Sequence, residues 1–275
     1  MKRNKNIFLF LLLVAWILFF NTDLWAKDSL VYHKKIGNYQ ISIFNDHEKS
    51  FQYVNIKKEK MILFHEEGFG EYFYLGNNFD DSLNGKDIYS GRSLNNNGIP
   101  NLVISHWTGG SHCCHFLYIF ELGIDFKVIG KIDVGSSDIK LKDIDHDNIP
   151  EIVFWDSSID YQFASFASSP KGKVILKFQN GKYELATHLM RKPLPKLSVL
   201  KAMYKNSNYE FEDKNNISEL PFSFLEAMII LSYSGHFNEA LKFADDVWPK
   251  NKDGLENFKK EFSSALNESK YWKNF

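Results

Sequence analysis

The sequence has little of what marks a specialised class of protein. Its 275 residues include only 7 prolines and 16 glycines, which excludes a collagen-like chain. It also lacks an excess of one charge, because 33 lysines and arginines are matched by 34 aspartates and glutamates. The formal net charge of −1 therefore gives no support for nucleic acid as the main partner. With 44% hydrophobic and 16% aromatic residues, the composition is that of a globular chain with a sizeable core rather than a disordered one.

Motifs of several large enzyme classes are also missing. The sequence contains no Gly-x-Ser-x-Gly, no phosphate-binding loop and no His-Glu-x-x-His. Together with the N-terminal segment and the acidic loop described below, this favours our first functional hypothesis, an exported, calcium-braced, non-enzymatic binding or interaction protein whose partner is an unknown protein or glycan ligand. A hypothesis of catalysis has to rest instead on a local cluster of reactive side chains.

The sequence has one long hydrophobic run, and it lies near the N-terminus. An apolar run of 14 residues, Ile7–Phe20, follows a basic segment at residues 2–5. A helix that spans a membrane needs roughly 20 apolar residues, so this pattern favours a secretory signal peptide over residues 1–26, with cleavage after Ala26. An uncleaved signal anchor is the alternative. We expect a periplasmic or secreted protein without a membrane span in the mature chain.

Short segments rich in β-branched and aromatic residues, separated by turn residues, fill residues 27–190. This alternation of strands and turns predicts a mainly β domain. The dipeptide Asn180-Gly181 between two such segments is a strong signal for a hairpin. The expected strands include residues 39–44, 61–67, 71–76, 102–107, 115–122, 126–134, 151–156 and 173–178.

The pattern changes towards the C-terminus. Residues 191–217 begin with a proline-containing stretch and are expected to form a linker. Residues 218–275 are expected to be helical, because Pro221 fits a first helical turn and Gly235 fits a helix end. A second helix follows, so we expect a helical hairpin in this C-terminal α-helical region. Apolar residues at helical spacing mark that second helix: Phe237, Ala240, Leu241, Ala244, Val247 and Trp248.

Two segments of the expected β domain align without a gap at an offset of 50 residues, 93–105 and 143–155. Each reads as a turn, an Ile-Pro pair and an apolar strand, which is typical of a propeller blade or a related β repeat. About three units of this size fit into residues 27–190, and a closed propeller usually has more. The sequence therefore predicts a short or irregular β-propeller-like repeat domain.

The second of these segments places carboxylates at alternate loop positions, where side chains turn towards one centre. A hard cation would relieve their repulsion, and Ca²⁺ accepts irregular sets of oxygen ligands. A solvated acidic turn is the alternative. The equivalent residues of the first segment, among them Asn95 and Asn97, are uncharged, so we expect no ion there. The expected calcium ligands are Asp143, Asp145, Asp147, Glu151 and the backbone carbonyl of Ile149.

The segment DIDHDNIPEIV, residues 143–153, resembles the Asp-rich loop of FG-GAP/VCBS-type repeats, which occur in integrin-like β-propellers. The resemblance implies bound calcium, with Asn148 in place of the usual glycine. A wider resemblance, carried by residues 98–114, 163–176 and 269–272, is to a family of small exported bacterial proteins of unassigned function. It implies export and the repeat but supplies no catalytic residues.

The sequence has only two cysteines, Cys113 and Cys114, and they are adjacent. In an oxidising compartment two lone thiols favour a disulfide, here between neighbours. An intermolecular bridge, free thiols, or a metal or thiol-redox site with His112, His115 and His106 are the alternatives. Successive residues of a strand face opposite sides, so residues 112 and 114 would face one side and residues 113 and 115 the other, which disfavours one tetrahedral site made by all four. An exported enzyme with thiol-redox or transition-metal chemistry at this segment is our second functional hypothesis.

Overall fold

The computed structural model divides the chain into two compact units, Met1–Phe73 and Tyr74–Phe275. This division lies at a different place from the boundary that the sequence suggests near residue 190. The expected signal peptide, residues 1–26, lies outside the residues that the structure describes. The described residues are 28–46, 48, 51–69, 72–76, 87–205, 220–250 and 253–275.

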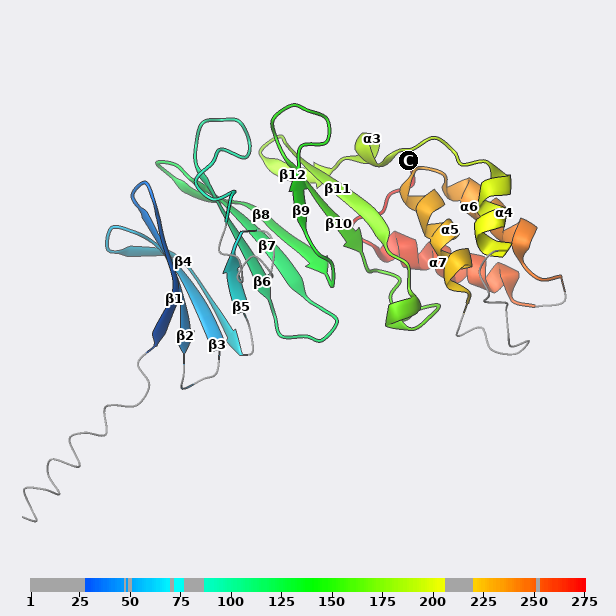
Figure 1. Cartoon of the computed structure of the whole chain (residues 1–275), viewed down its shortest axis with the longest axis horizontal. Helices are drawn as coiled ribbons and strands as arrows, with labels where there is room; N and C mark the ends of the chain where they lie inside the picture. The colour runs from blue at the N-terminus through cyan, green and yellow to red at the C-terminus, as the bar shows by residue number, and fades with distance from the viewer. Residues whose placement is uncertain are drawn as a thin grey trace, which may run out of the picture. The chain divides into compact units, whose positions relative to one another are not determined.

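The first unit contains a four-stranded antiparallel sheet in the order β1-β2-β3-β4 (Figure 1). Its first hairpin has a two-residue turn that begins at Gly37, whose positive φ of 55° suits glycine. Alternate residues of β2 are buried, which is the pattern of a strand with one face against a core. The strands are β1 (Ser29–Ile36), β2 (Tyr39–Asp46), β3 (Phe51–Lys58) and β4 (Met61–Phe69).

Two further four-stranded antiparallel sheets follow, in the orders β5-β6-β7-β8 and β12-β11-β10-β9. The hairpin at Asn180-Gly181 forms as predicted, with φ of 54° and 82° at its two turn residues. These sheets make the fold mainly β, as the sequence predicts, but they do not close into a propeller. The strands are β5 (Tyr72–Leu75), β6 (Asn101–Trp107), β7 (His115–Leu122), β8 (Phe126–Gly135), β9 (Lys140–Lys142), β10 (Glu151–Asp156), β11 (Gly172–Gln179) and β12 (Lys182–Leu185).

The C-terminal region is helical, and it begins earlier than the sequence suggests. Part of the expected linker forms α4, while residues 206–217 lie outside the described residues. Helix α5 follows Pro221, and Gly235 with a φ of 85° separates it from α6, so the expected hairpin is present. The helical elements are η2 (Phe166–Ser168), α3 (Thr187–Met190), α4 (Leu197–Lys205), α5 (Phe222–Tyr233), α6 (Phe237–Val247) and α7 (Leu255–Glu268).

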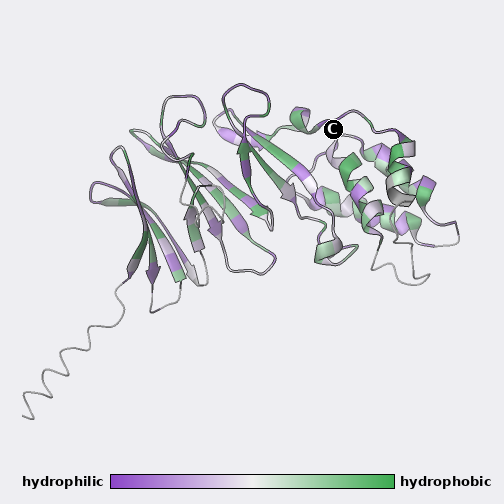
Figure 2. Cartoon of the chain, in the orientation of Figure 1, coloured by the Kyte–Doolittle hydropathy of each residue, from purple (hydrophilic) through white to green (hydrophobic). Residues whose placement is uncertain are grey.

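One hydrophobic core joins the sheets and helices of the second unit. It runs from Val103 and Leu117, through Val174, to Phe224 and Phe258. Helix α5 is buried along most of its length, and Figure 2 shows its hydrophobic residues. The helices are therefore part of the same packed body as the second and third sheets. None of the helices in the described ranges has the length and apolar character needed to cross a membrane.

Candidate functional site

Cys113 and Cys114 form a disulfide between sequence neighbours, in the loop that joins β6 to β7. Within the described part of the chain no cysteine is left free. The loop needs glycine before the pair, because a Cβ at Gly110 would overlap the carbonyl of Cys113. The carbonyl of Gly110 in turn accepts a hydrogen bond from the indole N–H of Trp107 at 2.9 Å. Local packing thus holds the disulfide in place.

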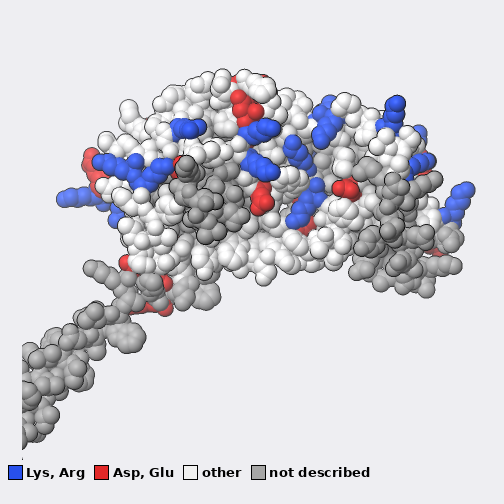
Figure 3. Space-filling model, viewed as in Figure 1, with Lys and Arg blue, Asp and Glu red and all other residues white. Residues whose placement is uncertain are grey.

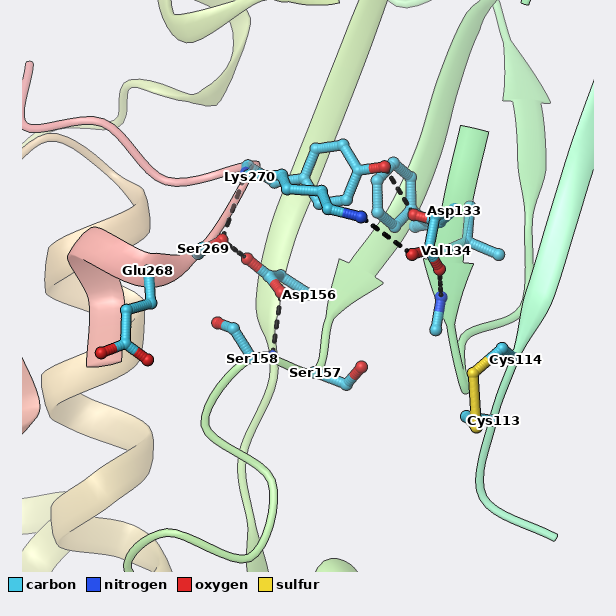
Figure 4. A pocket seen from close by; sticks show the side chains of 13 residues that line it. Cys113, Cys114, Asp133, Val134, Asp156, Ser157, Ser158, Glu268, Ser269 and Lys270 are labelled. Atoms are coloured by element: carbon cyan, nitrogen blue, oxygen red, sulfur yellow. Dashed lines mark hydrogen bonds and ion pairs between the residues drawn. A yellow bond between two sulfur atoms is a disulfide. The ribbon is translucent and has the colours of Figure 1, made fainter. Parts of the chain in front are cut away.

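The disulfide forms one wall of a cavity of about 290 Å³ (Figure 4). The other walls come from the ends of β8 and β10 and from the segment that follows α7. Gly135 belongs to this lining, and a Cβ there would overlap the hydroxyl of Ser157, so the two strand ends approach closely. The pocket therefore lies where the second sheet, the third sheet and the C-terminal segment meet within the second unit.

Asp156, one of the residues that line this pocket, connects three elements. Its side chain is buried, and it accepts hydrogen bonds from the hydroxyl of Tyr233 at 2.6 Å, from the hydroxyl of Ser269 and from the backbone N–H of Ser158 at 2.9 Å. Burial, together with the charge of Asp156, raises the pKa of Tyr233, so the phenol remains a donor. With both its oxygens engaged, Asp156 holds β10 against α5 and the C-terminal segment rather than presenting a free base.

A second polar group also lines the pocket. The Lys270 ammonium is 3.1 Å from a carboxylate oxygen of Asp133, and the Tyr271 hydroxyl donates to the Asp133 carbonyl at 2.5 Å. The ring of Tyr271 meets Phe154 edge to face, with centroids 4.8 Å apart. The side chain of Asp133 is 35% exposed and that of Lys270 is 71% exposed. This ion pair is therefore accessible to a ligand, unlike Asp156.

The three histidines suggested as an alternative site do not gather around the cysteines. His112 stacks on Phe166, with ring centroids 4.1 Å apart, and hydrogen-bonds to Tyr161. His106 is buried in β6, and burial lowers the pKa of His115 in β7, which favours its neutral form. Among the described residues, the group of His, Cys, Asp and Glu side chains placed to hold a metal ion is elsewhere, at Asp143, Asp145 and Glu151.

The acidic loop forms, but an ammonium group lies among its carboxylates. The Lys177 Nζ is 2.5 Å from Asp145, 2.6 Å from Asp147 and 3.2 Å from Glu151. Asp143 is the exception, and its two oxygens accept backbone N–H groups of the loop instead. Three of the four expected acidic ligands therefore already have a cation. A calcium ion could use these oxygens only by displacing Lys177, so the residues do not fit calcium as they stand.

Lysines of the third sheet lie in two different environments. Although burial opposes the charge of Lys177, its hydrogen bonds to Asp145, Asp147 and Glu151 raise its pKa. Burial lowers the pKa of Lys173, and so do the nearby charges of Lys192, Lys142 and Lys140. Figure 3 shows Lys and Arg side chains gathered over this part of the surface. Lys173 also lines a second cavity, of about 460 Å³, between β11 and α5.

Comparisons with protein-family models, with curated proteins and with solved structures find no match for the chain. The resemblance to FG-GAP/VCBS repeats accordingly stays a prediction. Sequence reasoning found the cysteine pair and the acidic residues, but it missed Lys177 and Lys270. The only sequence signal for Lys177 was its place in the strand before Asn180-Gly181.

Proposed function

We propose that this chain is an exported, non-enzymatic binding protein and that the pocket beside Cys113–Cys114 receives its ligand. The N-terminal segment supports export, because its basic residues and apolar run are typical of a signal peptide. The polar groups of the pocket support binding rather than catalysis. Asp156, its buried carboxylate, is fully hydrogen-bonded, and Asp133 is paired with Lys270.

The chemistry of the walls favours a polyhydroxylated ligand such as one unit of a glycan. The disulfide and the ring of Tyr271 offer apolar contact to the C–H face of a sugar. Asp133 and Lys270 offer an acceptor and a donor to its hydroxyl groups, and Ser157 offers both. Small-molecule pockets usually measure roughly 300–1,000 Å³, so a cavity of about 290 Å³ suits a single ring rather than a large ligand.

The observation that carries this proposal is the placement of the accessible Asp133–Lys270 pair and the disulfide on the same cavity (Figure 4). The ion pair is polar and partly exposed, and the disulfide is apolar and rigid. A pocket with both kinds of wall can orient a ligand as well as bind it.

A saccharide array followed by calorimetry tests the proposal. We expect at least one saccharide to bind, and Asp133→Asn to weaken that binding about tenfold, because a hydrogen bond to a charged group contributes roughly 1.5–3 kcal/mol. Asp125→Asn is the matched control, since Asp125 is exposed just before the other end of β8. Failure of every saccharide to bind, or equal loss in both variants, would reject the proposal.

Thiol-disulfide exchange is the second candidate function, and one observation favours it. Cys113 is exposed and also lines the pocket, so a thiol substrate could reach its sulfur. Exchange needs attack by a thiolate on that sulfur. Turnover in an insulin-reduction assay with dithiothreitol as the electron donor, above the rate with dithiothreitol alone and lost in Cys113→Ser, would favour this function over binding. Absence of turnover together with saccharide binding would favour the first proposal.

A further inference from the structure

The two repeat loops, 93–101 and 143–151, have the same backbone. Positions four and six take positive φ in both: Asn96 and Gly98 in the first loop, His146 and Asn148 in the second. Three hydrogen bonds also recur with nearly equal lengths. The backbone N–H at position seven donates to the side chain at position five, from Ile99 to Asn97 at 2.9 Å and from Ile149 to Asp147 at 2.8 Å. The N–H at position six donates to the side chain at position one, from Gly98 to Ser93 and from Asn148 to Asp143, both at 3.0 Å. The N–H at position two donates to the side chain at position nine, from Leu94 to Asn101 at 2.6 Å and from Ile144 to Glu151 at 2.7 Å.

At the centre of the first loop lies a carboxylate. Glu121 of β7 is the cross-strand partner of Asn101. One oxygen of Glu121 accepts hydrogen bonds from the amide groups of Asn95 at 2.9 Å and Asn97 at 2.6 Å. Its side chain is only 8% exposed. A negative group is thus held by neutral donors at positions three and five of the loop.

The centre of the second loop has the opposite charge. Lys177 of β11 lies across from Glu151, one step beyond the paired residues Ile152 and Leu176. Its ammonium binds Asp145 and Asp147, which are again positions three and five. The fold therefore places one charged side chain, from the neighbouring strand, at the same point of each loop. Only the sign differs, and the loop residues differ to match it.

We propose that Lys177 is the resident cation of the acidic loop and takes the place that the FG-GAP/VCBS resemblance assigns to calcium. An ammonium group has three N–H donors and no acceptor. Three carboxylates surround it, so each donor has one charged acceptor: Asp145, Asp147 and Glu151. The repulsion that makes a calcium ion attractive in this loop is therefore relieved within the chain.

Most of the remaining carboxylate oxygens accept backbone N–H groups. Asp143 accepts the N–H groups of Asp147 and Asn148, and the second oxygen of Glu151 accepts the N–H of Ile144. Lys177 belongs to β11, which lies between β10 and β12 in the sheet, and its side chain is only 15% exposed. To admit a metal at these oxygens, the loop would have to displace the ammonium from three carboxylates at once. We therefore expect the folded protein to be indifferent to calcium. This inference does not depend on the ligand of the pocket.

Calorimetric titration of the purified wild-type protein with calcium chloride is the direct test. We expect no saturable binding up to millimolar calcium, and a melting temperature that differs by less than about 1 °C between calcium and chelator, because no free ligand set remains to link binding to folding. Saturable binding to the wild type that Asp145→Asn removes would overturn the proposal.

The variant Lys177→Met supplies the complementary test, because it keeps the apolar stem and removes the ammonium. The carboxylates should then behave as a metal site, so that calcium raises the melting temperature by at least about 3 °C. Lys260→Met, an exposed position on α7, is the matched control and should gain no calcium dependence. A Lys177→Met protein that folds and ignores calcium would count against the proposal. If the variant folds only with calcium, that rescue supports it. If it folds under neither condition, the wild-type titration alone decides.

Discussion

Lys177 and Glu151 face each other on neighbouring strands, with 3.2 Å between the ammonium nitrogen and a carboxylate oxygen. The Glu151 side chain has no exposed surface, and its other oxygen accepts the backbone N–H of Ile144. The Glu151 carboxylate thus contacts both the backbone of the repeat loop and Lys177 of β11. Loss of its charge would leave a nearly buried ammonium with poorer acceptors.

Glu151→Gln should therefore destabilise the protein by about 3 kcal/mol, since breaking a buried pair leaves an uncompensated charge. Urea unfolding followed by circular dichroism measures the change in the free energy of unfolding. Glu184→Gln is the control, because Glu184 pairs with Lys182 on the surface of β12. The control should change little. Equal stability of the two variants would show that the Glu151 pair is not buried in solution.

Chemical reactivity should separate the lysines of β11. Hydrogen bonds to three carboxylates raise the pKa of Lys177 even though burial opposes its charge, whereas burial and neighbouring lysines lower the pKa of Lys173. Only the neutral amine reacts with acetylating reagents. At about pH 8.5 we expect Lys173 to be acetylated at least about ten times faster than Lys177, because one pKa unit corresponds to a tenfold change in the neutral fraction. Peptide mass spectrometry gives both rates in one sample. Equal rates would contradict the charge arrangement.

The sequence predicted those parts of the fold that depend on local pattern. The Asn180-Gly181 turn forms because both residues tolerate positive φ. Helix α5 begins directly after Pro221, whose ring and missing N–H disfavour helix on its N-terminal side, and it ends before Gly235, which takes a positive φ. Helix α4 was missed because the proline-containing stretch before it suggested a linker, although its own residues are good helix formers.

The local sequence pattern could not predict which cation the acidic loop binds. The spacing of Asp143, Asp145 and Asp147 indicates a cation, but the partner lies on another strand, with residues 157–171 between the two strands. Strand register therefore decides which side chain meets the loop, and register depends on the whole sheet. The pocket was missed for the same reason, since its walls come from four separate segments of the chain.

Gly172 should tolerate no side chain. A Cβ at this first residue of β11 would overlap the ring of Tyr233, which is buried and hydrogen-bonded to Asp156. Gly172→Ala should therefore cost at least about 2 kcal/mol of stability, because a packed ring anchored at its hydroxyl cannot move aside. Gly123→Ala is the control, since an added Cβ there would lie 3.3 Å from a flexible methyl group of Ile99. Thermal unfolding compares them, and similar melting temperatures would contradict the packing of α5 on β11.

Acid should weaken the wild-type protein partly through Asp147. The hydrogen bond from Lys177, then that from the Ile149 N–H, lowers the pKa of Asp147 below its ordinary value of 3.8. A lowered pKa in the folded state contributes stability that is complete above pH 3.8 and is lost as the pH falls through the folded value. In Lys177→Met the main cause of the shift is gone, so the pKa of Asp147 should rise towards its ordinary value and this contribution should shrink.

Carbon-detected NMR of the Asp147 carboxyl group, titrated from about pH 6 to pH 2, measures this pKa directly in the wild type and in Lys177→Met. Lys260→Met again serves as the control, because it removes a lysine without touching the loop, and it should leave the pKa of Asp147 at the wild-type value. The titration also separates the two possible cations of the loop. If Lys177 holds it, calcium should not change the pKa of Asp147 in the wild type but should lower it in Lys177→Met, where the ion can replace the ammonium. A calcium-dependent pKa of Asp147 in the wild type would show that the metal, and not Lys177, occupies the loop.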